Sequence, residues 1–340
     1  MGEAKKRGTK EERIKQAQLK KFGRDENTCI ICRKNNLDAI PSLEHVIPES
    51  LGGNYCITSV CEKCNNDLGK SADSVLVNHK FSDFFRLENK IKGKGKALPN
   101  PFEGIFTTPS NPDLKYQTIL LDEGKNLEMK LLPSPKIFKN ENDEISTIEI
   151  TVDAKDEKEI DKILEKIIKR NNLENMTVNK EISTVIQERN LPFQGKFSID
   201  TFNFRMGLLK IAYEFMVDTY PEYFPNEDAK LISEILLNND YEKLKAIKMT
   251  DGFDKTLTSK FGQIIDFNKN QHIIFSCSYD KVLMCLVKIK DVFETLIVMS
   301  HNFKLNLNEY VIGVNDIEKN EFKKTNFLNY INARGDFNQL

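Results

Sequence analysis

The chain lacks several features that would place it in other broad classes of protein. No apolar run in its 340 residues approaches the length needed to span a membrane. No secretory signal opens the sequence, so we expect a cytoplasmic protein with reduced thiols rather than disulfides. The formal net charge of −1 excludes a uniformly basic nucleic-acid binder, so any such binding must depend on local patches. A phosphate-binding loop and internal repeats are also missing, which excludes the common nucleotide-binding and solenoid classes.

Four cysteines stand in two CxxC pairs, Cys29 with Cys32 and Cys61 with Cys64. Each pair lets two thiolates from one tight turn reach a single ion, and two pairs complete a closed tetrahedral shell of the structural kind. The 28 residues between the pairs, 33–60, exceed the usual spacing of a short zinc ribbon, so the shell encloses a substantial insert. A redox CxxC would need a βαβ context, which the sequence does not show. We therefore predict Zn²⁺ as a structural cofactor.

The insert has the pattern strand, loop, strand, helix. Residues 43–47 are rich in strand formers, and a proline followed by a Gly-Gly pair ends the run. Residues 55–60 are predicted to return as a second strand, and the polar text from Glu62 onwards, with its spaced apolar residues, indicates a helix. Neighbours on a regular strand point to opposite faces, so Glu44 and His45 can serve one site only if the strand ends there.

This segment resembles the HNH endonucleases, the ββα-metal class, in the form whose zinc is held by two CxxC pairs. The resemblance covers about residues 27–78 and rests on the motifs Leu43-Glu44-His45-Val46-Ile47-Pro48, Gly52-Gly53 and Cys61-x-x-Cys64-Asn65. It implies that His45 is the general base, which takes a proton from an attacking water. It also implies that Glu44 and Asn65 bind a catalytic Mg²⁺ or Mn²⁺, because carboxylate and amide oxygens are hard ligands.

One position departs from the family pattern. The middle Asn of the motif normally stands a few residues before the second CxxC, where this chain has Cys56. Asn54 is the nearest candidate for the loop-ordering role of that residue. Asn66 and Asp67 compete with Asn65 as metal ligand, and we favour Asn65 because it directly follows the second CxxC. The alternative interpretation of the histidine is an ordinary strand-end residue beside a structural zinc.

Two local basic patches offer contacts to a phosphate backbone. Residues 1–34 hold eleven Lys or Arg against five Asp or Glu, although a solvated charge run explains this excess equally well. The second patch can follow a backbone without reading sequence, because flexible glycines separate its lysines. Its members are Lys90, Lys92, Lys94 and Lys96.

The remaining sequence indicates an α+β arrangement. Strands are predicted at 116–121, 127–132, 146–152, 272–277, 282–287 and 295–299, and helices at 81–90, 156–170, 198–218 and 227–237. The helix at 198–218 carries Arg205, Lys210 and Glu214 among apolar residues. We interpret it as a core helix with a polar edge; the alternative directs Arg205 and Lys210 towards a phosphate or another ligand.

The sequence therefore predicts an α+β protein in which an N-terminal zinc-stapled ββα-metal nuclease unit precedes a larger mixed α+β domain. The predicted parts are a basic segment at 1–26, the nuclease domain with its four-cysteine zinc site at 27–98, an accessory domain at 99–314, and a polar tail at 315–340. We expect the accessory domain to position substrate, sense a signal or mediate assembly.

The resemblance implies hydrolysis of DNA phosphodiester bonds, with RNA as the alternative substrate, as in restriction or anti-phage defence effectors. We expect DNA as partner, no membrane association, and either a homo-oligomer or an activating partner or ligand at the C-terminal domain. Two alternatives stay open. One is a non-catalytic zinc-binding module that docks nucleic acid or a protein. The other is a nuclease gated by a ligand or partner of the C-terminal domain.

Overall fold

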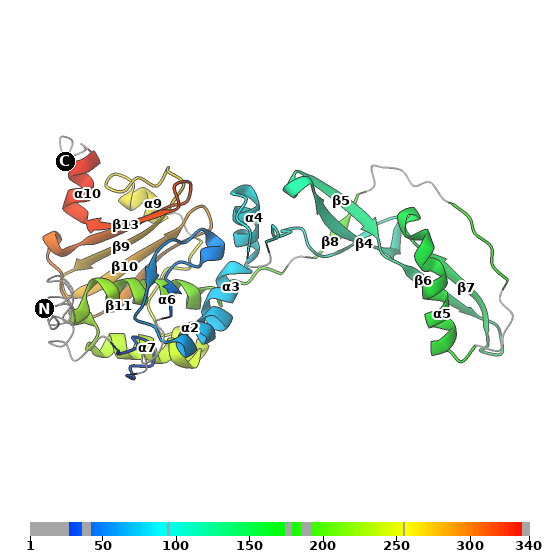
Figure 1. Cartoon of the computed structure of the whole chain (residues 1–340), viewed down its shortest axis with the longest axis horizontal. Helices are drawn as coiled ribbons and strands as arrows, with labels where there is room; N and C mark the ends of the chain where they lie inside the picture. Colours follow the sequence, from blue (N-terminus) through cyan, green and yellow to red (C-terminus); the bar gives the residue numbers. More distant parts are fainter. Residues whose placement is uncertain are drawn as a thin grey trace, which may run out of the picture. The chain divides into compact units, whose positions relative to one another are not determined.

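The computed structural model describes residues 27–35, 42–93, 96–173, 179–184, 192–196, 198–253 and 256–334. It confirms the mixed α+β class and divides the chain into two compact units (Figure 1). Unit 1 combines Met1–Pro99 with Ile199–Leu340, and unit 2 is Asn100–Ser198. This division differs from the predicted one, because sequence reading assigns contiguous stretches to a domain. Here the chain after residue 199 packs with the N-terminal segment, and unit 2 is an insertion.

The N-terminal part of unit 1 follows the predicted order of strand, loop, strand and helix. Its two strands form an antiparallel hairpin, and each strand is only two residues long. The predicted strand at 55–60 is therefore much shorter in the structure. The elements are β1 (Glu44–His45), η2 (Glu49–Leu51), β2 (Cys56–Ile57), α2 (Glu62–Leu68), the π-helical turn η3 (Gly69–Asp73), α3 (Ser74–Val77) and α4 (Lys80–Glu88).

The C-terminal part of unit 1 contains a five-stranded antiparallel sheet in the order β11-β10-β9-β12-β13. Alternate residues of β9 enter two different cores, with Ile274 on one face and Ile273 and Phe275 on the other. Both faces are therefore covered. The strands are β9 (Gln271–Tyr279), β10 (Val282–Ile289), β11 (Phe293–Ser300), β12 (Val311–Asp316) and β13 (Glu321–Asn326).

Helices cover both faces of this sheet. One face packs against α6 and α7, and the other contributes to a second core with α9 and α10 (Figure 1). The predicted polar tail from residue 315 instead includes part of β12, all of β13 and α10. β13 is an edge strand in which every side chain is exposed or half-buried, so its sequence is polar although it belongs to the sheet. The helices are α6 (Arg205–Thr219), η6 (Pro221–Tyr223), α7 (Glu227–Asn238), α8 (Tyr241–Leu244), α9 (Thr256–Phe261), η7 (Leu307–Glu309) and α10 (Phe327–Arg334).

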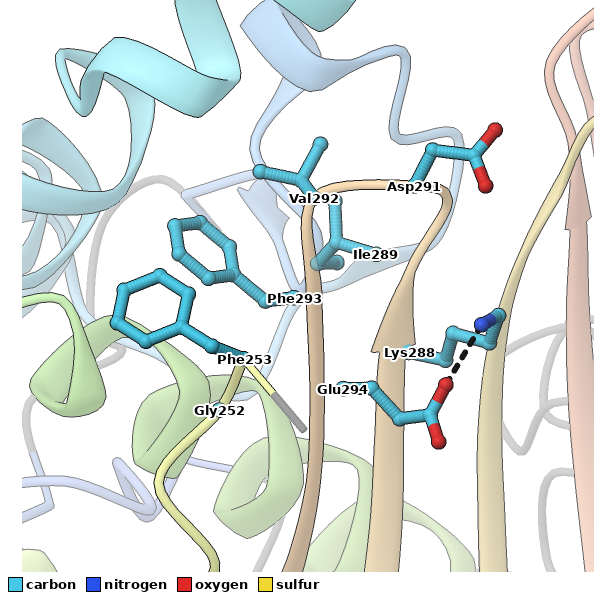
Figure 2. A pocket seen from close by; sticks show the side chains of 8 residues that line it. All are labelled: Gly252, Phe253, Lys288, Ile289, Asp291, Val292, Phe293 and Glu294. Carbon is cyan, nitrogen blue, oxygen red and sulfur yellow. Dashed lines mark hydrogen bonds and ion pairs between the residues drawn. The ribbon is translucent and has the colours of Figure 1, made fainter. Parts of the chain in front are cut away.

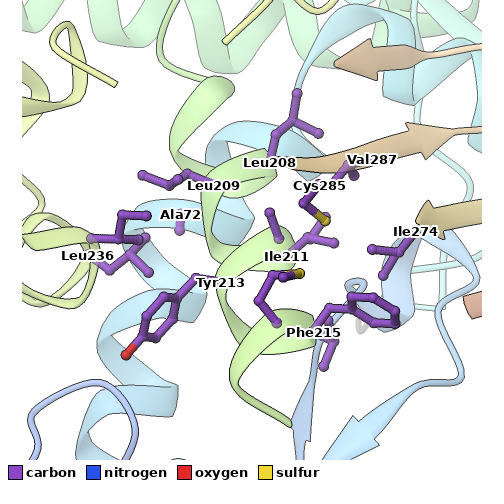
Figure 3. Packing of buried hydrophobic residues seen from close by; sticks show 14 of the residues in the cluster. Ala72, Leu208, Leu209, Ile211, Tyr213, Phe215, Leu236, Ile274, Cys285 and Val287 are labelled. Carbon is purple, nitrogen blue, oxygen red and sulfur yellow. The ribbon is translucent and has the colours of Figure 1, made fainter. Parts of the chain in front are cut away.

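Helix α6 is central to unit 1, because it lies between the N-terminal segment and the sheet. Figure 3 shows its side chains packed with Ala72 of η3 and with Cys285 and Val287 of β10. Gly207 permits the close approach to η3: a Cβ at this position would lie 2.7 Å from the backbone oxygen of Ala72. The N-terminal segment and the C-terminal sheet thus share one hydrophobic core.

The described residues of unit 2 form two antiparallel sheets and one amphipathic helix. The predicted hairpin around residues 122–125 joins β4 to β5, as expected. Its elements are β3 (Ile105–Thr108), β4 (Asn111–Leu121), η4 (Asp122–Gly124), β5 (Asn126–Leu131), β6 (Ser134–Lys139), β7 (Ile145–Thr151), η5 (Ala154–Glu159), α5 (Ile160–Arg170) and β8 (Gln194–Gly195). Among the described residues of the whole chain, no helix has the length and apolar character needed to cross a membrane.

Candidate functional site

The four cysteines of the two CxxC pairs lie together in the structure. Cys29 and Cys32 precede the hairpin, whereas Cys61 caps α2 and Cys64 lies in its first turn. Their sulfur atoms are all within 4.8 Å of one another, and all seven cysteines of the chain are free thiols. A tetrahedral zinc ion with Zn–S bonds of ~2.3 Å needs sulfurs about 3.8 Å apart. The cluster is therefore compatible with structural zinc, as predicted.

Hydrogen bonding within the cluster favours ionisation of one thiol. The hydrogen bond with Cys64 is the main cause that lowers the pKa of Cys29 to about 5, and the N–H of Cys61 donates to the same sulfur at 3.4 Å. The same contact with Cys29 raises the pKa of Cys64, and burial raises the pKa of Cys32. Because zinc binds thiolates, zinc binding releases the remaining protons and strengthens as pH rises.

Glu44 and His45 occupy β1 and differ in their exposure. Glu44 is 2% exposed, whereas His45 is half-buried, as expected for neighbours on opposite faces of a strand. The strand ends at His45, which meets the condition set by the sequence for a shared site. His45 lies opposite Cys56 of β2 in the hairpin register. The structure thus presents the predicted base near the surface and turns the predicted carboxylate ligand inward.

The carboxylate of Glu44 forms an ion pair with the ammonium group of Lys210 from α6. Lys210 also donates a hydrogen bond to the backbone carbonyl of His45 at 2.8 Å. The predicted polar edge of α6 is therefore wrong, since Lys210 and Glu214 are both 0% exposed. The sequence did contain a signal. A helix that is apolar on all sides is a buried helix, so a Lys–Glu pair at i,i+4 on it must find partners inside the protein.

Asn65 lies in α2 and is half-buried. Its Nδ2 donates to Ser42 Oγ at 2.6 Å and to the carbonyl of Leu43 at 3.1 Å. These bonds tie α2 to the residues that lead into β1, so the elements carrying the predicted base and ligand are in direct contact. They engage the amide nitrogen and orient the amide with its oxygen as the remaining acceptor. The competing candidates Asn66 and Asp67 are exposed.

One comparison with known proteins assigns this region. A family model described as HNH endonuclease matches residues 29–81. Residues 29–81 are therefore similar to the HNH endonucleases, and this segment is called the HNH domain below. A search of curated proteins and a search of solved structures returned no match to the chain. The resemblance drawn from the motifs is thus confirmed for this segment, and the family implies nuclease activity on a nucleic acid.

The loop that joins the two strands of the HNH domain is held by the C-terminal sheet. Asn315 of β12 is fully buried, and its Oδ1 accepts from the backbone N–H of Asn54 at 2.7 Å. Its Nδ2 donates to the carbonyl of Gly52 at 2.8 Å, and Asn54 Nδ2 donates to the same carbonyl at 3.0 Å. Asn54 therefore makes a local loop bond. Asn315 adds two more hydrogen bonds to the loop. This residue could not be predicted from the sequence, because no local sequence pattern links residues so far apart in the chain.

His272 of β9 anchors the same loop beside Asn315, its cross-strand partner. Its Nε2 donates to the carbonyl of Leu51 at 2.7 Å, and its Nδ1 accepts from the backbone N–H of Lys290 at 3.0 Å. Complete burial lowers the pKa of His272 to about 4, although the hydrogen bond to Leu51 opposes this shift. The imidazole is therefore neutral at pH 7 and serves as a fixed connector between the HNH domain and the sheet.

The lysines predicted to contact phosphate follow α4. Lys90, Lys92 and Lys96 are exposed, and Lys94 lies outside the described residues. Lys90 and Lys96 have left-handed backbone conformations, with φ of 55° and 58°, so the chain turns sharply at both. Exposed lysines on turns suit contact with a phosphate backbone, and this role stays a prediction.

A separate hollow in unit 1 offers less chemistry (Figure 2). It is lined by Gly252, Phe253 and residues of the β10–β11 turn, including Lys288 and Glu294. Lys288 Nζ lies 2.7 Å from Glu294 Oε2 and 2.9 Å from the hydroxyl of Thr258. The two buried charged groups of the hollow, Lys288 and Glu294, thus satisfy each other. We therefore place the functional site at the HNH domain.

Proposed function

We propose that the protein is an endonuclease that hydrolyses phosphodiester bonds of DNA with the help of a divalent metal ion. The proposal rests on the HNH domain at residues 29–81, which carries His45 on β1 and Asn65 on α2. The hydrogen bond from Asn65 to the carbonyl of Leu43 ties α2 to the residue that precedes β1. DNA is the proposed substrate and RNA the alternative. The expected role in restriction or anti-phage defence stays a prediction.

His45 is the proposed general base. An imidazole can take a proton from a water molecule as that water attacks phosphorus. The backbone of His45 is held on two sides, since β2 pairs with β1 and Lys210 binds the histidine carbonyl. A base on a fixed backbone approaches the attacking water from one direction, which is the condition for efficient proton transfer.

Asn65 and Glu44 are the proposed ligands of Mg²⁺ or Mn²⁺. The amide oxygen of Asn65 suits a hard cation. Because Glu44 forms an ion pair with Lys210, its carboxylate would have to contact the metal ion and the ammonium group at the same time. When bound, the ion would stabilise the negative charge that develops on the leaving oxygen. The zinc cluster takes no part in this step, since a closed shell of four sulfurs leaves no open position.

The proposal is tested by incubating full-length protein with supercoiled plasmid in Mg²⁺, in Mn²⁺ and in EDTA. We compare wild type with His45→Ala and with His301→Ala, a matched control at an exposed histidine. We expect metal-dependent nicking by wild type and by His301→Ala. Loss of the general base should slow nicking by His45→Ala by about 100-fold or more.

The outcome separates the candidate functions. Equal cutting by wild type and His45→Ala would refute the assignment of the base. Folded, zinc-loaded protein that binds DNA without cutting it would favour the docking module. Cutting of an RNA of matched sequence in place of the plasmid would change the substrate and leave the mechanism intact.

A further inference from the structure

A single buried lysine connects the two halves of the proposed site. Lys210 projects from α6 and is 0% exposed, which is unusual for an ammonium group because burial of a charge is costly. Its contacts reach two elements of the HNH domain, β1 and η3. A charge is kept inside a protein only where partners compensate it, so these contacts define what Lys210 does.

On the β1 side, Lys210 contacts both predicted site residues. Its Nζ donates to the backbone carbonyl of His45 at 2.8 Å and forms an ion pair with the carboxylate of Glu44. The first contact fixes the backbone from which the imidazole extends. The second fixes the side chain of the neighbouring residue.

On the helix side, Lys210 binds the π-helical turn that continues α2. Its Nζ lies 3.1 Å from Asp73 Oδ1 and 3.3 Å from Asp73 Oδ2. Glu214, one turn along α6 and also 0% exposed, lies 3.6 Å away. Burial lowers the pKa of Lys210, but the charges of Asp73, Glu214 and Glu44 outweigh it and raise the pKa overall, so the ammonium group stays charged. One cation thus joins β1 to η3.

We infer that Lys210 is a positioning residue of the proposed nuclease, which sets the placement of His45 relative to the helix that carries Asn65. This inference rests on the proposed function. Lys210 acts through its hydrogen bond to the His45 carbonyl and through its ion pairs with Glu44 and Asp73. The distance of Lys210 from η3 depends in turn on Gly207, which lets α6 approach η3 closely.

The first test removes the ammonium group while preserving the formal charge of the cluster. Lys210→Met alone would make the buried cluster more negative in formal charge, which weakens folding. In Lys210→Met/Glu214→Gln both members of one ion pair become neutral side chains, so the formal net charge of the cluster is unchanged. Kinetics are compared with the Glu214→Gln background. We expect kcat for plasmid nicking to fall about 100-fold with KM for DNA within about twofold, because misplaced groups slow the chemical step rather than binding.

The second test moves Lys210 without changing any charge. A Cβ at Gly207 would lie 2.7 Å from the Ala72 oxygen and 2.9 Å from Leu76 Cβ, so Gly207→Ala must displace α6 from η3. The matched control is Gly69→Ala in the same helix pair, where a Cβ meets nothing within 4 Å. We expect Gly207→Ala to lower kcat at least tenfold with KM unchanged, and Gly69→Ala to leave both unchanged.

Zinc content and the thermal midpoint are measured for each variant, so that loss of the fold is distinguished from loss of placement. The inference is overturned if Lys210→Met/Glu214→Gln or Gly207→Ala is folded and zinc-loaded and keeps kcat within threefold of its control. It is also overturned if KM alone changes. Wild type that makes no His45-dependent cut overturns the proposed function and this inference together. If wild type makes a His45-dependent cut and the Lys210 and Gly207 variants cut equally well, only the inference is overturned.

Discussion

Protonation of His272 should weaken the fold, because the native structure holds this imidazole neutral. Its ordinary pKa is 6.5, and burial lowers the pKa to about 4 in the folded protein. Between these values the unfolded chain binds a proton that the folded chain does not. Stability is therefore complete above pH 6.5 and is lost as pH falls towards 4. Near pH 4 the folded imidazole itself binds the proton at Nδ1, which removes the acceptor of the Lys290 N–H.

The size of the effect follows from the gap between the two pKa values. A gap from 6.5 to about 4 corresponds to about 3 kcal/mol of unfolding free energy once protonation is complete. About 2 kcal/mol of this is already lost at pH 5, where the unfolded imidazole is almost fully protonated and the folded one is not. A domain with a typical total of about 5–15 kcal/mol would register such a loss clearly.

Urea unfolding at several pH values between 7.5 and 5 measures this loss. Zinc release also destabilises the protein in acid, so the informative quantity is the difference between wild type and His272→Gln. The variant should be less stable at pH 7.5, because it loses the packed ring and one hydrogen bond, but its stability should fall about 2 kcal/mol less on the way to pH 5. His301→Gln, at an exposed position, should follow wild type. Parallel curves for His272→Gln and wild type would refute the reasoning.

Two further predictions concern the dependence of the HNH domain on the C-terminal sheet. Asn315→Leu removes the acceptor of the Asn54 N–H and one of the two donors to the Gly52 carbonyl, and should cost about 1–3 kcal/mol in urea unfolding, whereas Asn329→Leu, at an exposed site, should change little. Replacing 100–198 by a glycine-serine linker of about 15 residues should give a folded, zinc-loaded protein, whereas a 1–100 fragment should not fold. Circular dichroism and zinc content report whether the linker variant and the 1–100 fragment fold. A folded 1–100 fragment would contradict the conclusion that the N-terminal segment shares its core with the C-terminal sheet.

The cysteine cluster and the family of the HNH domain could be predicted from the sequence because the residues of each motif are close together in it. The CxxC pairs predicted the cysteine cluster, and the motif around His45 identified the family. Proline and glycine marked the loop, and apolar spacing marked the following helix. Such signals are local, since each depends on residues within one turn or one short strand.

The residues that hold this site in place could not be found in the same way. Lys210, His272 and Asn315 each contact the HNH segment across at least 137 positions of chain. A single sequence does not reveal such pairings, because a polar residue within an apolar run is compatible with either a surface edge or a buried contact. Only Lys210 carried a usable signal, from its place on a helix without a polar face.

The size of the HNH segment explains why it needs this support. Its hairpin has two-residue strands, and an isolated two-stranded hairpin is marginally stable in water. Zinc fixes the ends of the hairpin region, but it does not reach the loop at 51–54 or the backbone at His45. Those positions are fixed by β9, β12 and α6. Residues 199–340 therefore belong to the scaffold of the proposed active site, and we expect their deletion to unfold the HNH domain rather than to activate it.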